Sequence, residues 1–211
     1  MKNCSWTICR LLLCAIVGCC AAAAAGLAQD KPKPAAPGAA GQQAAQQDAA
    51  MADMTKMMSP GPEHQKLQSL MGSFACDSTS FMNPQGPEKT KGTQNVTWVL
   101  GGRFLMSKYS GTAAGMPFEG IGMDGYDNLN KKYVGSWFDS LSTGIMPYEG
   151  SMDADSKVLT MKGSYDDPMS GGKQTVRMVT TIVDPNKHTF EMYGSMNGQE
   201  MKMMEMTCTR K

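Results

Sequence analysis

The chain has 211 residues and a formal net charge of +1, from 20 Lys and Arg against 19 Asp and Glu. This length suits one ordinary domain with extensions. No stretch concentrates Lys and Arg, which argues against a nucleic-acid partner.

Residues 1–28 have the order of a secretory signal. Lys2 and Arg10 supply positive charge, residues 11–18 form a short apolar run, and small residues continue to Ala28. The apolar run is too short to span a bilayer. We therefore expect an exported protein, located in the periplasm or outside the cell.

Two processing routes remain open. Cleavage after Ala28 suits the ordinary signal peptidase, whereas residues 16–19 resemble a lipobox that would place a lipid on Cys19. Such a lipid would be the only predicted membrane contact. Cleavage after Ala28 would remove five of the seven cysteines and leave 18 basic against 19 acidic residues.

Residues 29–58 form a predicted disordered linker rich in Ala, Gln and Pro, with at most a loose helical turn near its end. It has few large apolar side chains to offset the entropy of ordering. A short helix is expected next, because Ser59 can cap it and Leu67, Leu70 and Met71 share one face. Gly72 is the expected end of that helix.

Residues 59–211 form the predicted domain, an up-and-down antiparallel β-barrel of about ten strands behind the helix. Turn signals recur about every ten residues, and short runs rich in β-branched and aromatic residues lie between them. Long crossover loops are absent from the pattern, which favours a meander. Examples of the turn signals are Asn83-Pro84-Gln85-Gly86, Gly101-Gly102, Asp166-Asp167-Pro168 and Asp184-Pro185-Asn186.

Cys76 and Cys208 lie near the start and the end of this domain. Barrel closure makes the first and last strands neighbours, and an exported protein meets an oxidising environment. A Cys76–Cys208 disulfide is therefore predicted. Two free, buried thiols are the alternative.

Several motifs of residues 59–211 together resemble the domain of unknown function 1579 family. That resemblance implies a calycin-like, lipocalin-type barrel and no established activity. The family usually has Gly-Thr-Trp where this chain has Gly72-Ser73-Phe74, so the resemblance implies a weaker cation–π contact between Phe74 and Arg210 at the closed end. The motifs are Pro60-Gly61-Pro62-Glu63-His64, residues 98–105, residues 115–120, Gly125-Tyr126-Asp127-Asn128, residues 131–134, Trp137, Asp139-Ser140, Ser142-Thr143-Gly144 and residues 188–193.

A ligand cavity inside the barrel is the first functional hypothesis, since a barrel of this size can hold one small molecule. In the alternative, aromatic side chains fill the interior and the carboxylates face water. The candidate wall or mouth residues are Trp98, Glu119, Tyr126, Trp137, Asp139, Tyr148 and Glu149.

Acid–base catalysis is a weaker hypothesis that rests on an internal repeat. Residues 116–120 recur as residues 146–150, which predicts two strands running the same way with Glu119 and Glu149 about 10 Å apart. No further motif supports a reaction, so no catalytic residue is assigned.

Copper binding is a further hypothesis, because soft thioethers select Cu(I). The weak candidate site is Met51, Met54, Met57 and Met58. Strand alternation places Met201 and Met203 on one face and Met204 and Met206 on the other, which argues against a C-terminal site. No other metal site and no cofactor are predicted.

The function favoured by the sequence is therefore non-catalytic binding of a small apolar ligand in the barrel. An envelope interaction protein with a filled barrel is the second choice. A carboxylate-dependent enzyme or a methionine-based copper binder comes third. The sequence leaves the ligand and the oligomeric state open.

Overall fold

The computed structural model describes residues 38–167, 171–196 and 198–211. The predicted signal peptide, with the cleavage site at Ala28 and the lipid site at Cys19, lies outside these residues. Contacts group residues 44–211 into one compact unit.

Helix α1, Ala39–Met58, occupies most of the segment that was predicted to be a disordered linker. Ala and Gln dominate it, and both favour helix, while Gly41 is its only Gly or Pro. The side chains of residues 41–58 are all exposed, so intrinsic propensity rather than packing explains this helix. Residues 29–37 of the predicted linker lie outside the described part of the chain.

The predicted short helix is present as α2, Pro62–Gln65, continued by a 3-10 turn, η1, Lys66–Leu70. Gly61 caps it instead of Ser59, and His64 Nδ1 accepts a hydrogen bond of 3.0 Å from the Gly61 N–H. The segment ends at Met71, one residue earlier than expected, where the backbone becomes extended.

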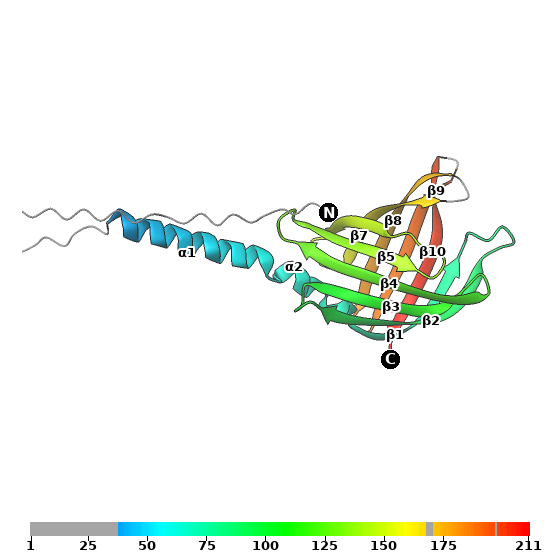
Figure 1. Ribbon diagram of the computed structural model, residues 1–211. Helices are drawn as coiled ribbons and strands as arrows, with labels where there is room; N and C mark the ends of the chain where they lie inside the picture. The colour runs from blue at the N-terminus through cyan, green and yellow to red at the C-terminus, as the bar shows by residue number, and fades with distance from the viewer. Residues whose placement is uncertain (1–37, 168–170, 197) are drawn as a thin grey trace, which may run out of the picture. The chain divides into compact units, whose positions relative to one another are not determined.

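Ten antiparallel strands form a closed barrel in which each strand pairs with its neighbours in sequence and β1 pairs with β10 (Figure 1). This confirms the prediction of an up-and-down barrel. The strands are β1 Gly72–Ser80, β2 Glu88–Val99, β3 Phe104–Ala113, β4 Met116–Asp127, β5 Lys132–Asp139, β6 Met146–Met152, β7 Val158–Asp167, β8 Gly172–Asp184, β9 Lys187–Met196 and β10 Gln199–Arg210.

The helical segment α2–η1 closes one end of the barrel. Leu67 is fully buried there, and the Tyr133 hydroxyl donates to Glu63 Oε2 over 2.9 Å. The Trp98 indole N–H donates to Gln68 Oε1 over 2.6 Å. These contacts join the segment to β5 and β2, so we refer to this end as the closed end.

Arg210, the last residue of β10, also holds the helical segment α2–η1 in place. Its guanidinium donates to the carbonyls of Met71, Ser69 and Pro185 at 2.8, 3.1 and 3.1 Å. It also lies 4.8 Å from the centre of the Phe74 ring, so the cation–π contact implied by the family resemblance is present.

Replacing Arg210 with Ala should lower the free energy of unfolding by about 3 kcal/mol, because three carbonyls lose a charged donor. Urea denaturation followed by circular dichroism measures this loss. Arg210→Lys serves as the control, since it keeps the charge but cannot reach all three carbonyls, and it should fall between the two. Equal stability of Arg210→Ala and the wild type would contradict this role.

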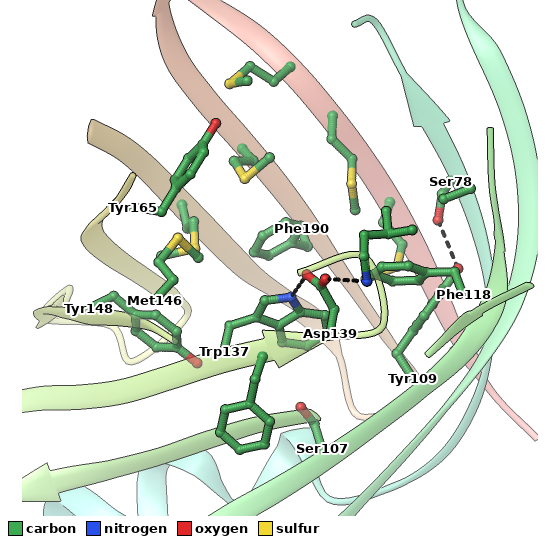
Figure 2. Close-up of a pocket in the computed structure, with 18 of the residues that line it drawn as sticks. Ser78, Ser107, Tyr109, Phe118, Trp137, Asp139, Met146, Tyr148, Tyr165 and Phe190 are labelled. Atoms are coloured by element: carbon green, nitrogen blue, oxygen red, sulfur yellow. Dashed lines mark hydrogen bonds between the residues drawn. The ribbon is translucent and has the colours of Figure 1, made fainter. Parts of the chain in front are cut away.

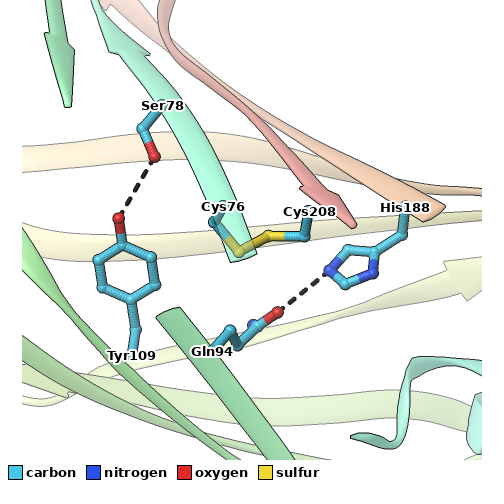
Figure 3. Close-up of a disulfide and its surroundings, with 6 residues drawn as sticks. All are labelled: Cys76, Ser78, Gln94, Tyr109, His188 and Cys208. Carbon is cyan, nitrogen blue, oxygen red and sulfur yellow. Dashed lines mark hydrogen bonds between the residues drawn. A yellow bond between two sulfur atoms is a disulfide. The ribbon is translucent and has the colours of Figure 1, made fainter. Parts of the chain in front are cut away.

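The pairing of β1 with β10 closes the barrel, and the predicted disulfide lies within it (Figure 3). Cys76 is directly opposite Cys208 in the register, and their Cα atoms are 4.1 Å apart. Both side chains are buried. The prediction of a Cys76–Cys208 disulfide is confirmed.

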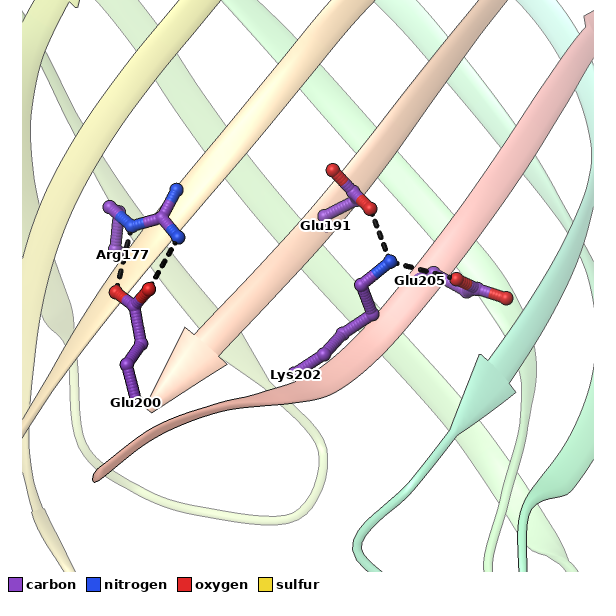
Figure 4. A network of polar contacts seen from close by, with 5 residues as sticks. All are labelled: Arg177, Glu191, Glu200, Lys202 and Glu205. Atoms are coloured by element: carbon purple, nitrogen blue, oxygen red, sulfur yellow. Dashed lines mark hydrogen bonds and ion pairs between the residues drawn. The ribbon is translucent and has the colours of Figure 1, made fainter. Parts of the chain in front are cut away.

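Charged side chains form a network on β8, β9 and β10 (Figure 4). Arg177 donates to both carboxylate oxygens of Glu200 at 2.8 and 2.7 Å, and Lys202 lies between Glu191 and Glu205. The side chains of these pairs are all partly exposed, and each such pair contributes about 1 kcal/mol or less. The network marks the outer face of these strands.

Candidate functional site

The barrel encloses a cavity of about 1700 Å³. Leu67 and Leu70 of the closed end line it at one side, and the loops around residues 82–84, 112–114 and 140–145 line it at the other. The cavity therefore extends from the helical segment toward the opposite end, which we call the mouth. Its volume exceeds the roughly 300–1,000 Å³ of ordinary ligand pockets.

Glycines on the inner wall explain why large aromatic side chains leave this space open. A Cβ atom added at Gly120 would lie 2.1 Å from Cζ2 of Trp137, and one at Gly135 would lie 2.2 Å from Cε2 of Tyr148. Each ring therefore lies over a glycine of the neighbouring strand. Trp137 and Tyr148 both border the cavity (Figure 2).

Methionines form much of the opposite wall. Met161, Met178, Met192 and Met204 are direct register partners on β7, β8, β9 and β10. We call this row the methionine ladder, and all four residues line the cavity. Thioether side chains are apolar and flexible, so this wall can adapt to ligands of different shape.

A β-bulge changes the predicted orientation of the C-terminal methionines. The β9–β10 register shifts between Lys202 and Met204, and Met203, Met204 and Met206 all line the cavity. Simple alternation, which separated Met203 from Met204 and Met206, was wrong here because the bulge adds one residue to β10.

Asp139 organises the mouth. Its Oδ2 accepts a hydrogen bond of 2.9 Å from the Trp137 indole N–H, and its Oδ1 accepts one of 3.0 Å from the Leu141 backbone N–H (Figure 2). The carboxylate thus fixes both the indole ring and the start of the loop at residues 140–145.

Asp124 is the most deeply enclosed carboxyl group of the cavity wall. Its Oδ1 accepts a hydrogen bond of 2.9 Å from the Tyr148 hydroxyl. Burial raises the pKa of Asp124 to about 6, although the hydrogen bond from Tyr148 acts in the opposite direction. The same burial, together with the charge of Asp124, raises the pKa of Tyr148 well above its ordinary value.

His188 lies near the closed end, beside the disulfide (Figure 3). Its Nε2 is 3.1 Å from Gln94 Oε1, and its ring packs edge-on against Phe74 with centres 4.6 Å apart. Burial, followed by the charge of Arg210, lowers the pKa of His188 to about 4. The imidazole is therefore neutral at neutral pH.

The structure distributes the seven predicted wall residues among three places. Trp137, Asp139 and Tyr148 line the cavity. Trp98 contacts η1, and Tyr126 packs against His64 and Tyr133 with ring centres 6.1 and 5.0 Å apart, so these two belong to the closed end. Glu119 and Glu149 are exposed and do not line the cavity.

The register also separates Glu119 from Glu149. The two repeats begin β4 and β6, as the sequence predicted. However, Glu149 lies opposite Val134, which lies opposite Gly125, six residues from Glu119. Six residues correspond to about 20 Å along a strand, in addition to two strand spacings of about 4.8 Å. The expected separation of about 10 Å was therefore wrong, and the two carboxylates are not a pair.

The copper hypothesis gains no further support from the structure. Met51, Met54, Met57 and Met58 are exposed on α1. Within the described part of the chain, no group of three or more His, Cys, Asp or Glu side chains could hold a metal ion. Copper binding at the four methionines stays a prediction.

Sequence reasoning missed Asp124, Ser107 and His188 as cavity residues. A signal for Asp124 was present, because Gly120, Gly122 and Asp124 alternate along one face of β4. The glycines concealed it, since they interrupt the apolar pattern that normally marks an inner face.

Several solved structures are similar to this chain. The crystal structure of Rv2717c from M. tuberculosis is similar with a TM-score of 0.54 and 16% identity, over 72% of this chain and 99% of that chain. A redesigned beta barrel has a TM-score of 0.37 and 16% identity, over 69% of this chain and 95% of that one. No curated protein matched the chain. The likeness to Rv2717c concerns the fold alone.

Residues 59–210 match the family described as "Protein of unknown function (DUF1579)". The match begins three residues before α2 and ends at the last residue of β10, so it covers the complete barrel. Because it covers well over half of the sequence, the chain belongs to the DUF1579 family.

Proposed function

We propose that this protein binds a small, largely apolar molecule inside the barrel. The observation that carries the proposal is the cavity of about 1700 Å³ between the closed end and the mouth. Its walls combine the methionine ladder with the rings of Trp137 and Tyr148, and a few polar groups interrupt them. Apolar walls with few fixed polar groups are typical of ligand sites.

The hollow interior argues against the alternative of a filled barrel. Three aromatic side chains could have occupied the space, but Trp137, Tyr148 and Tyr109 each lie against a glycine of the wall. An interior that served stability alone would gain from close packing, because buried contacts add dispersion energy. An open interior instead supports the hypothesis that the barrel binds a ligand.

We further propose that the protein is exported and works in an oxidising compartment. The Cys76–Cys208 disulfide is compatible with export. None of the helices in the described part of the chain has the length and hydropathy to cross a bilayer.

Titration with Nile red, a neutral apolar dye, tests the proposed function. We expect saturable binding of one dye per chain, with increased dye emission. Gly120→Val should weaken binding at least tenfold, because its side chain displaces the Trp137 ring into the cavity. Gly172→Val is the matched control, since a Cβ atom at Gly172 meets no atom within 4 Å.

Two results would contradict the proposal. One is the absence of saturable binding by the wild type. The other is equal affinity of the wild type and a folded Gly120→Val variant, which would place the dye on the outer surface. Circular dichroism spectra of both variants establish that they are folded.

A further inference from the structure

One carboxylate oxygen in the cavity wall has no partner. Asp124 Oδ1 accepts the hydrogen bond from Tyr148, whereas Oδ2 has no hydrogen bond or ion pair with any described residue. Asp124 is half-buried and borders the cavity. Every inaccessible side-chain oxygen of the described residues has a hydrogen-bond partner, so Oδ2 is accessible from the cavity. A charged carboxylate oxygen in that position is a strong acceptor.

A second oxygen lies beside it. A Cβ atom at Gly122 would be 2.7 Å from Ser107 Oγ and 3.6 Å from Asp124 Oδ2. Ser107 Oγ therefore occupies the room that the missing Cβ atom of Gly122 leaves, and Asp124 Oδ2 lies beside it on the same face of the wall. Ser107 is buried and lines the cavity, without a hydrogen bond of its side chain to a described residue. Two neighbouring acceptor oxygens on the cavity wall can receive a group that carries several N–H donors.

The charges around the cavity favour a cation. Among the described residues that line it, Lys173 is the only Lys or Arg. Lys173 is exposed at the mouth and directly opposite Asp166. His188 is neutral at neutral pH because of its lowered pKa. No cation in the described part of the wall thus lies near Asp124, and a carboxylate ligand such as a fatty acid would find no positive partner in the interior.

The aromatic rings near Asp124 add to this preference. Tyr148 donates to Asp124, and its ring lies over Gly135. The ring of Trp137 lies over Gly120 and close to Gly122, where an added Cβ atom would be 3.4 Å from Cε3. Ring faces attract cations, most strongly when water is excluded.

The distance from Asp124 to the mouth sets the room for the rest of the ligand. Asp124 is eight residues from Met116, the first residue of β4 at the mouth. Eight residues span about 26 Å of strand, which is about 20 Å along the barrel axis at an ordinary strand tilt. A hydrocarbon chain or ring system fits between the charged anchor and the mouth.

We propose that the cavity takes an apolar molecule with one protonated primary amine, and that Asp124 and Ser107 receive the amine. The inference rests on the proposed function and names the ligand class for the same cavity. The ammonium group donates to Asp124 Oδ2 and to Ser107 Oγ. The hydrocarbon part lies against the methionine ladder.

Displacement of Nile red by three ten-carbon compounds tests the inference. The compounds are decylamine, decanol and decanoate, used below their micelle concentrations at pH 7.5. Decylamine should displace the dye at concentrations at least tenfold lower than decanol, because it forms a charge-assisted hydrogen bond. Decanoate should be the weakest of the three.

Two variants locate the effect. Asp124→Asn should bind decylamine at least tenfold more weakly while it still binds Nile red, which also shows that it is folded. Asp166→Asn is the matched control at the mouth and should bind decylamine like the wild type.

The pH profile of the unmodified protein is an independent readout. With a pKa of about 6, Asp124 is mostly neutral at pH 5, so decylamine binding should weaken about tenfold from pH 7.5 to pH 5. Decanol binding should change little. Tyr148 and His188 keep their protonation states over this range. Glu88, Asp139, Asp166 and Lys173 also border the cavity, so Asp124→Asn, which keeps all four, should lose most of this pH dependence.

The outcomes separate the inference from the proposed function. Equal displacement by decylamine and decanol, or an unchanged decylamine affinity in Asp124→Asn, would overturn the inference and leave the apolar site intact. Failure of Nile red and of all three compounds to bind would overturn both.

Discussion

Replacing Cys76 and Cys208 together with Ala should lower the free energy of unfolding by about 5 kcal/mol in the chain-entropy description of a disulfide. The bridge joins residues 132 apart in sequence, so it restricts a long loop of the unfolded chain. It also joins β1 to β10, the one strand pair of the barrel that is distant in sequence. Guanidinium denaturation of the variant and the wild type measures the difference.

Reduction provides the control for this experiment. A reducing agent should lower the stability of the wild type toward that of the double variant, and it should leave the double variant unchanged. A double variant as stable as the oxidised wild type would show that the bridge adds nothing to the β1–β10 pairing.

His188→Gln should make the protein more resistant to acid. The pKa of His188 is lowered to about 4 in the folded state, whereas an unfolded histidine titrates near 6.5. The unfolded chain therefore binds the proton first, and stability is lost as the pH falls from about 6.5 toward 4. Between pH 7 and pH 4.5, the free energy of unfolding of His188→Gln should fall by about 2 kcal/mol less than that of the wild type.

Asp124→Asn should have the opposite effect. The pKa of Asp124 is raised to about 6 in the folded state, so the folded chain binds this proton first and gains stability as the pH falls from 6 toward 3.8. Without Asp124, the free energy of unfolding should therefore fall by about 2 kcal/mol more between pH 7 and pH 4.5 than it does in the wild type. Urea titrations at both pH values measure the free energy of unfolding of the wild type and the two variants. Parallel pH profiles of the three proteins would contradict the pKa shifts of His188 and Asp124.

The barrel was predictable because its signals are local. Turn residues such as Asn83-Pro84 and Asp184-Pro185 recur at the length of one strand and its turn, and ten strands follow. The disulfide then followed from topology, because closure makes the first and last strands neighbours. Both inferences need the order of the strands but not their exact register.

The site was less predictable because it depends on register and on which side chains point inward. Glu119 and Glu149 belong to similar sequences, yet their strands are offset. β6 begins opposite Trp137, which lies opposite Gly122, and Gly122 is six residues beyond the start of β4. Gly120, Gly122 and Gly135 face the interior without an apolar side chain to mark that face. The bulge at Met203 arises from pairing with β9, which the sequence of β10 alone does not reveal.

The methionine ladder gives the interior a sensitivity to oxidants. Methionine sulfoxide is polar and chiral, unlike the apolar thioether from which it forms. Met161, Met178, Met192 and Met204 border one another across four strands, so their successive oxidation to sulfoxides would convert a continuous apolar surface into a hydrophilic one. The backbone pairing would persist, because thioethers take no part in it, so the barrel would stay closed around a more polar interior.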